Sequence, residues 1–116
     1  MSFGKYIKKS REELAEVQSG YSLRKVASAI EVEPSFLSKV ERDLVAPPSE
    51  AKIIALADFL NEDPDVLLAM AGKVSTDLQE IIRKRPQLFG DLIRKLKSEP
   101  DHAVLKLVRE VKTGDW

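Results

Sequence analysis

The segment SLRKVASAIEVEPSFLSKVER, residues 22–42, places two short apolar repeats on either side of one proline. Ser22 is well suited to cap a first helix, and Pro34 is suited to the first position of a second one, where its missing N–H has no intrahelical partner. The apolar face of the first helix consists of Leu23, Val26, Ala27 and Ile30. The segment therefore predicts two short helices joined by a tight connection. The polar residues on the outer face of the second helix are Ser35, Ser38 and Lys39.

Helical periodicity continues through the rest of the chain, and no stretch has the alternation of a strand. Up to Gly72 we expect about five helices, at residues 3–18, 22–30, 34–42, 49–60 and 64–72. The apolar positions of the first are Phe3, Ile7, Leu14 and Val17. Those of the fifth are Val66, Leu67 and Met70.

A new helical register begins after Gly72, with three short amphipathic helices expected from Thr76, Pro86 and Pro100. The second carries an apolar stripe formed by Leu88, Phe89, Leu92, Ile93 and Leu96. The third carries another, formed by Val104, Leu105, Val108 and Val111. Short helices cannot bury such stripes alone, so they are expected to pack on residues 1–72 or on a second chain. The chain thus divides into residues 1–72 and residues 73–116.

Composition excludes several kinds of site. The 116 residues include no cysteine and one histidine, so disulfides, thiolate metal sites and a histidine-based acid–base set are excluded. The acidic cluster at residues 61–65 lacks the spaced oxygens and the glycine of a calcium loop. We find no membrane span and no signal peptide, which favours a cytoplasmic protein. The sequence therefore predicts no enzyme, no metal and no cofactor.

The zero net charge conceals a separation of charge along the chain. Residues 1–45 hold 8 Lys/Arg and 7 Asp/Glu, whereas residues 46–72 hold 1 and 5. Residues 73–116 hold 10 Lys/Arg and 7 Asp/Glu. Any surface for nucleic acid must therefore be locally basic.

Residues 22–42 resemble the helix-turn-helix of the Cro/lambda-repressor-like family, also called the XRE family. Ala27 stands where that motif needs a small residue, and the apolar positions are filled by Val26, Ile30, Val32, Leu37 and Val40. PSFLSKVER is similar to the recognition helix of the family, and residues 47–72 are similar to its fourth and fifth helices. The resemblance implies an all-α fold, with a five-helix lambda-repressor-like DNA-binding domain at residues 1–72. A short C-terminal helical extension, residues 73–116, lies outside it.

Two residues depart from the family pattern. Glu31 occupies the turn position usually given to glycine, where a left-handed backbone costs a residue with a side chain about 1 kcal/mol more. Either the turn differs slightly or the packing absorbs that cost. Glu33 replaces the usual small polar N-cap; its charge suits the helix dipole but would repel nearby phosphates.

The resemblance implies that the recognition helix enters the major groove of double-stranded DNA. The residues expected to contact bases are Glu33, Ser35, Phe36, Ser38 and Lys39. Lys39 favours guanine acceptors, Glu33 accepts from cytosine, and Phe36 suits a thymine methyl group. The residues expected to contact phosphates are Ser22, Arg24, Lys25 and Arg42.

These features favour a sequence-specific transcription regulator, a repressor that binds a palindromic operator as a homodimer. The nine residues of the two C-terminal stripes would then form the dimer contact. The alternative is an antitoxin-like protein whose C-terminal helices bind a partner protein while residues 1–72 bind DNA. A third possibility for the extension alone is that it folds back on the first domain.

Overall fold

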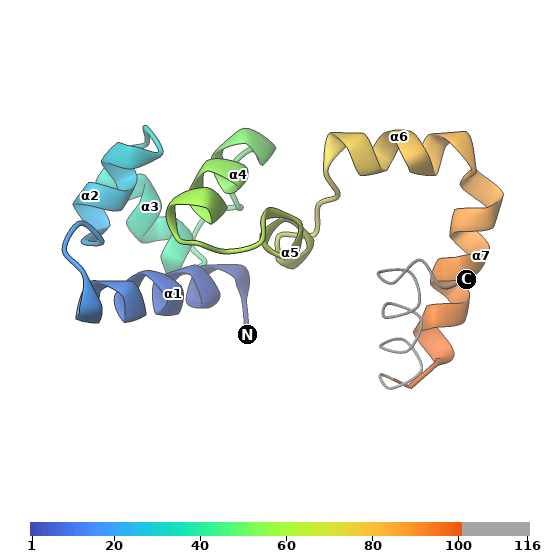
Figure 1. Cartoon of the computed structure of the whole chain (residues 1–116), viewed down its shortest axis with the longest axis horizontal. Coiled ribbons are helices and arrows are strands. Elements are labelled where there is room, and N and C mark those ends of the chain that lie inside the picture. Colours follow the sequence, from blue (N-terminus) through green and yellow to red (C-terminus); the bar gives the residue numbers. More distant parts are fainter. Residues whose placement is uncertain (101–116) are drawn as a thin grey trace. The chain divides into compact units, whose positions relative to one another are not determined.

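A computed structural model describes residues 1–100, which form seven helices and no strand (Figure 1). The helices are α1 Phe3–Val17, α2 Leu23–Ala29, α3 Pro34–Glu41, α4 Glu50–Phe59, α5 Pro64–Met70, α6 Thr76–Lys84 and α7 Pro86–Ser98. The predicted all-α class and the five helices before Gly72 are confirmed. The helix expected from Pro100, with Val104, Leu105, Val108 and Val111, lies outside the described residues. The chain divides into two compact units, Met1–Ser75 and Thr76–Trp116.

Local signals place the starts of the helices in the first unit. The Ser22 hydroxyl accepts a hydrogen bond from the Lys25 N–H at 3.2 Å, and Ser49 caps α4 in the same way. Pro34 and Pro64 begin α3 and α5. These starts agree with the helices predicted at residues 22–30, 34–42, 49–60 and 64–72, because each start depends only on chemistry within one helical turn.

The first unit closes around one apolar core. Among the described residues, 13 hydrophobic side chains are buried, and all of them come from this unit. They are Phe3, Ile7, Val26, Ala27, Ile30, Leu37, Val40, Ile53, Leu56, Ala57, Leu60, Leu67 and Leu68. Removing a side chain of this size from water stabilises the fold by roughly 1.5–3 kcal/mol, so the core is the main source of stability.

Two predicted apolar positions lie in solvent instead. Val66 is 46% exposed, and Leu68, which we did not predict, takes the buried place beside Leu67. At about 100° per residue, Val66 and Leu68 lie on nearly opposite faces of α5, so only one of them faces the core. Val17, at the end of α1, is 75% exposed. In the seven-residue α5, periodicity left the facing direction ambiguous, whereas Val17 lies beyond the buried positions of α1, the last of which is Ser10.

Four helices of the first unit end with the same backbone pattern. In α2, the Val32 N–H donates to the carbonyl oxygen of Ala27 at 2.9 Å, and in α3 the Leu44 N–H donates to that of Lys39 at 2.9 Å. This is a Schellman ending, which requires a left-handed residue just after the helix. Those residues are Glu31 (φ 60°), Asp43 (φ 57°), Asn61 (φ 57°) and Gly72 (φ 74°). The chain thus keeps the left-handed turn at Glu31 without a glycine.

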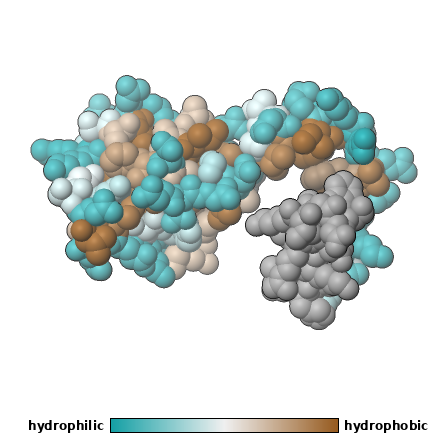
Figure 2. All heavy atoms as spheres, viewed as in Figure 1, coloured by the Kyte–Doolittle hydropathy of each residue, from teal (hydrophilic) through white to brown (hydrophobic). Residues whose placement is uncertain are grey.

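The second unit has a different surface. Neither α6 nor α7 has a buried residue, although both are amphipathic. Figure 2 shows apolar residues, in brown, along α6. No helix within residues 1–100 is long and apolar enough to cross a membrane.

Candidate nucleic-acid interface

α3 has one face in the core and the other in solvent. Leu37 and Val40 are each 2% exposed and pack into the core, as predicted. Ser35 and Lys39 are exposed and Ser38 is half-buried. The outer face therefore presents two hydroxyls and an ammonium on a helix that is anchored from behind.

The start of α3 is formed by Glu33 and Pro34. Glu33 occupies the N-cap position and is exposed, but its side chain makes no capping hydrogen bond. Its carboxylate is therefore not committed to the helix backbone. Phe36 is half-buried and packs against the core, so only part of its ring is available to a ligand.

The four residues expected at phosphates are all exposed. Ser22 uses an oxygen lone pair to cap α2 and keeps its hydroxyl hydrogen for a donor role. Arg24 and Lys25 lie in the first turn of α2, and no ion pair engages them within residues 1–100. The Arg42 Nε donates to the Ser38 carbonyl oxygen at 3.3 Å, which leaves its terminal amino groups available.

A buried ion pair holds the far end of α3 against α1. The Arg11 Nε lies 2.7 Å from Glu41 Oε2, and Arg11 Nη2 donates to Oε1 at 2.9 Å, with the two side chains 12% and 5% exposed. The hydrogen bond to Glu41 raises the pKa of the Arg11 guanidinium, against the opposing effect of its burial. Arg11 Nη1 also donates to the Tyr21 carbonyl oxygen at 3.3 Å, so one side chain joins three segments.

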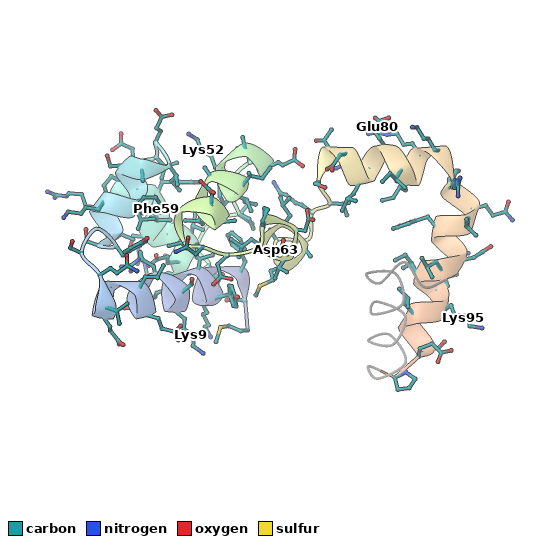
Figure 3. The ribbon with its side chains drawn as sticks, in the orientation of Figure 1. Lys9, Lys52, Phe59, Asp63, Glu80 and Lys95 are labelled. Carbon is teal, nitrogen blue, oxygen red and sulfur yellow. The ribbon has the colours of Figure 1, made fainter. Side chains whose placement is uncertain are left out.

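Lys52 holds the other end of the motif. Its ammonium donates to the carbonyl oxygens of Ile30 at 2.8 Å and Glu31 at 3.2 Å, and Figure 3 labels it on α4. A positive charge at the carbonyl end of α2 is favourable for the helix dipole. The left-handed turn before α3 is thus supported by a neighbouring helix. Sequence reasoning missed this contact and the Arg11–Glu41 pair, because their partners are 21 to 30 residues apart.

Comparison with known proteins agrees with this geometry. The XRE-type helix-turn-helix family matches residues 7–67, which is more than half of the chain. The chain belongs to this family. As a helix-turn-helix protein of the XRE type, it is a DNA-binding transcriptional regulator.

The match includes all nine residues that we expect at bases and phosphates, whereas α6 and α7 lie beyond it. A search of curated proteins gave no significant match. A solved structure described as the SinR protein/SinI protein complex contains a chain 26% identical to this helix-turn-helix protein, with a TM-score of 0.48. That alignment covers 84% of this chain and 99% of the other.

Proposed function

We propose that the protein is a repressor that reads a palindromic operator as a homodimer, with α3 in the major groove of each half-site. The observation that carries the proposal is the two-sided character of α3. Its inner face is fixed by Leu37 and Val40, while Ser35 and Lys39 face solvent. A helix held in this way can present side chains to base edges without reorganising on binding.

Base reading is assigned to the outer face of α3 and to its N-cap. Lys39 donates to guanine acceptors, while Ser35 and Ser38 donate or accept and so discriminate less. Glu33, whose carboxylate makes no capping bond, accepts from cytosine. The exposed part of Phe36 contacts a thymine methyl group.

Phosphate contacts are assigned to both sides of the motif. Ser22, Arg24 and Lys25 lie at the start of α2, and Arg42 follows the end of α3. Phosphate contacts from these two places would fix the register of α3 in the groove. No catalysis is needed: the protein acts by occupying promoter DNA, in the cytoplasm.

Dimerisation is assigned to the second unit. Leu88 is 63%, Leu92 44% and Ile93 46% exposed on α7, while Phe89 and Leu96 are half-buried. Surface of this kind is costly in water, and a second copy of the chain would cover it. The stripe at Val104, Leu105, Val108 and Val111 is proposed to join the same contact. The domain division, with DNA reading in residues 1–72 and dimerisation in residues 73–116, belongs to this proposal.

The apolar stripe of α7 suits pairing with itself. In an antiparallel pair centred between Leu92 and Ile93, these two residues of one copy face the same two of the other. Phe89 then faces Leu96 of the other copy. A two-fold contact of this kind is self-complementary in its apolar residues. On a palindromic operator, the two recognition helices of such a dimer would lie about one DNA turn, roughly 34 Å, apart.

Selection of DNA from a random pool by the purified full chain tests the proposal. We expect a two-fold-symmetric consensus, recovered at salt concentrations where a bulk DNA competitor is released. Sedimentation of the same sample at micromolar concentration should show a dimer. An asymmetric single-site consensus bound by a monomer would contradict the homodimer, and no enrichment of any sequence would contradict specific reading.

A second function is favoured by one observation, the apolar surface on α6. Ile81 is 59% and Leu78 39% exposed, and pairing of α7 alone leaves them in solvent. An antitoxin-like protein would use these helices to hold a partner protein. A purified chain that stays monomeric while still selecting DNA would favour this alternative.

A further inference from the structure

Asp43 ends the recognition helix in an unexpected way. It follows the C-cap Arg42 with φ 57°, a left-handed conformation that glycine adopts freely and L side chains rarely adopt. Its N–H donates to the Val40 carbonyl oxygen at 3.0 Å, which completes the Schellman ending of α3. Glycine would serve this local purpose better than aspartate, so the side chain needs another explanation.

The Asp43 carboxylate bonds to the start of the chain. Oδ2 accepts from the Ser2 hydroxyl at 2.6 Å, and Oδ1 accepts from the Gly4 N–H at 3.1 Å. Ser2 is the N-cap of α1 and Gly4 lies in its first turn. The carboxylate therefore acts as an additional cap on α1, supplied from 39 to 41 residues away.

The backbone is packed closely at the same point. A side-chain carbon built on Gly4 would overlap the carbonyl oxygens of Val40 and Glu41 and the Asp43 carboxylate. The first turn of α1 thus lies directly on the last turn of α3. Only a residue without a side chain permits this approach.

The other left-handed helix ends provide an internal comparison. Glu31 and Asn61 have the same backbone conformation as Asp43, and all three residues are exposed. Neither side chain has a hydrogen bond to another part of residues 1–100, whereas Asp43 makes two. The carboxylate of Asp43 therefore has a role that helix termination does not require.

We propose that Asp43 is a positioning residue that ties the end of α3 to the first turn of α1 and so sets how the recognition helix meets DNA. The inference rests on the DNA-reading role proposed above for α3. Arg42, the phosphate contact proposed at this end of the helix, directly precedes Asp43. The two hydrogen bonds from Ser2 and Gly4 to the Asp43 carboxylate are called the tie below. The Arg11–Glu41 pair holds the side of the same last turn, and Asp43 holds its tip.

The charge of Asp43 and its hydrogen bonds to α1 predict opposite changes in DNA affinity, so the two roles can be distinguished. A carboxylate next to Arg42 repels DNA phosphates, so removing the charge alone strengthens binding. Removing the tie loosens α3 and weakens binding. Asp43→Asn removes the charge but keeps an oxygen that accepts from Gly4 and a residue that tolerates a left-handed backbone. Asp43→Gly removes both charge and tie while relieving the backbone.

The experiment measures binding of the full chain to the DNA that the wild type selects from a random pool, together with the melting temperature of each variant. We expect Asp43→Gly to bind about tenfold more weakly at a temperature where every variant is folded. Asp43→Asn should stay within about threefold of the wild type or bind more tightly. The matched control Asn61→Gly should leave affinity unchanged and shift the melting temperature by less than about 4 °C, because its side chain makes no tie and the relief of the backbone is offset by the greater freedom of the unfolded chain.

Two results would overturn the inference. One is that Asp43→Gly changes the melting temperature no more than Asn61→Gly does and retains full DNA affinity. The other is that both Asp43 variants bind more tightly, which would make the carboxylate only a repulsive charge. Amide hydrogen exchange tests the contact between Asp43 and α1 without DNA, so its failure can be told apart from a failure of the proposed function. We expect faster exchange at Gly4 and in the last turn of α3 in Asp43→Gly. A wild type that selects no DNA would overturn the role in DNA reading, while slow exchange retained in Asp43→Gly would overturn the tie itself.

Discussion

The two units are both built from short helices, with opposite results. In the first, five helices and the residues that end them bury 13 hydrophobic side chains against one another. In the second, α6 and α7 are amphipathic, yet neither has a buried residue. An apolar stripe therefore identifies a helix that needs a partner, but it does not identify the partner. The first unit supplies its own, and we propose that a second copy of the chain supplies that of the second.

The largest effect is expected from breaking the ion pair that joins α1 to α3. Arg11→Ala leaves the Glu41 carboxylate buried and without its cation, which should lower the free energy of unfolding by about 3–5 kcal/mol. Urea unfolding followed by circular dichroism measures this. Lys9→Ala is the matched control, because its pair with Glu13 is about 60% exposed and should contribute less than about 1 kcal/mol. Equal effects of the two substitutions would show that the first unit does not depend on this buried pair.

The next effect tests the second unit and should leave the first unchanged. Phe89→Asp combined with Leu92→Asp places two carboxylates in the proposed contact, which should weaken dimerisation at least about 100-fold, or about 2.7 kcal/mol. Operator binding should weaken with it, whereas helix content should persist. Sedimentation velocity measures the association, and Gln87→Asp, on an exposed polar position of α7, is the control. A double variant that remains dimeric would place the contact elsewhere.

A smaller effect distinguishes residues that contact bases from residues that contact phosphates within the first unit. Lys39→Ala should change the preferred bases, with a loss of discrimination of roughly 1–3 kcal/mol at one position. Arg42→Ala should weaken all DNA sequences alike and reduce the salt dependence by about one phosphate contact. Competition binding on single-base operator variants at several salt concentrations measures both. Unchanged base preferences in Lys39→Ala would remove that residue from the reading surface.

The sequence predicted what depends on near neighbours along the chain. The caps at Ser22 and Ser49, the prolines that begin α3 and α5 and the inward face of α3 all follow from one or two helical turns. The outward position of Ser35 and Lys39 follows from the same periodicity, while their contact with DNA stays a prediction.

What the sequence did not predict depends on residues far apart in the chain. Arg11 and Glu41 are 30 residues apart, and Asp43 and Ser2 are 41 apart. No local pattern marks such pairs, since each residue alone looks like an ordinary polar or charged surface residue. The exposure of Val66 was missed for a related reason: the direction of a seven-residue helix is set by its neighbours rather than by its own period.

The smallest expected effect concerns the turn before α3. Glu31→Gly relieves a left-handed side-chain residue, a gain of about 1 kcal/mol, but adds freedom to the unfolded chain, a cost of roughly 0.4–1 kcal/mol. The Glu31 side chain makes no hydrogen bond elsewhere in residues 1–100. Lys52 donates to the Glu31 backbone carbonyl oxygen, which a glycine at this position retains. We therefore expect a net gain of at most about 0.5 kcal/mol in the free energy of unfolding. Urea unfolding measures the gain, and Glu31→Ala, which removes the carboxylate but keeps the strained Cβ, shows how much of it comes from charge. A clear loss of stability in Glu31→Gly alone would mean that the glutamate side chain supports the turn, and that the first unit absorbs the left-handed conformation through that side chain as well as through Lys52.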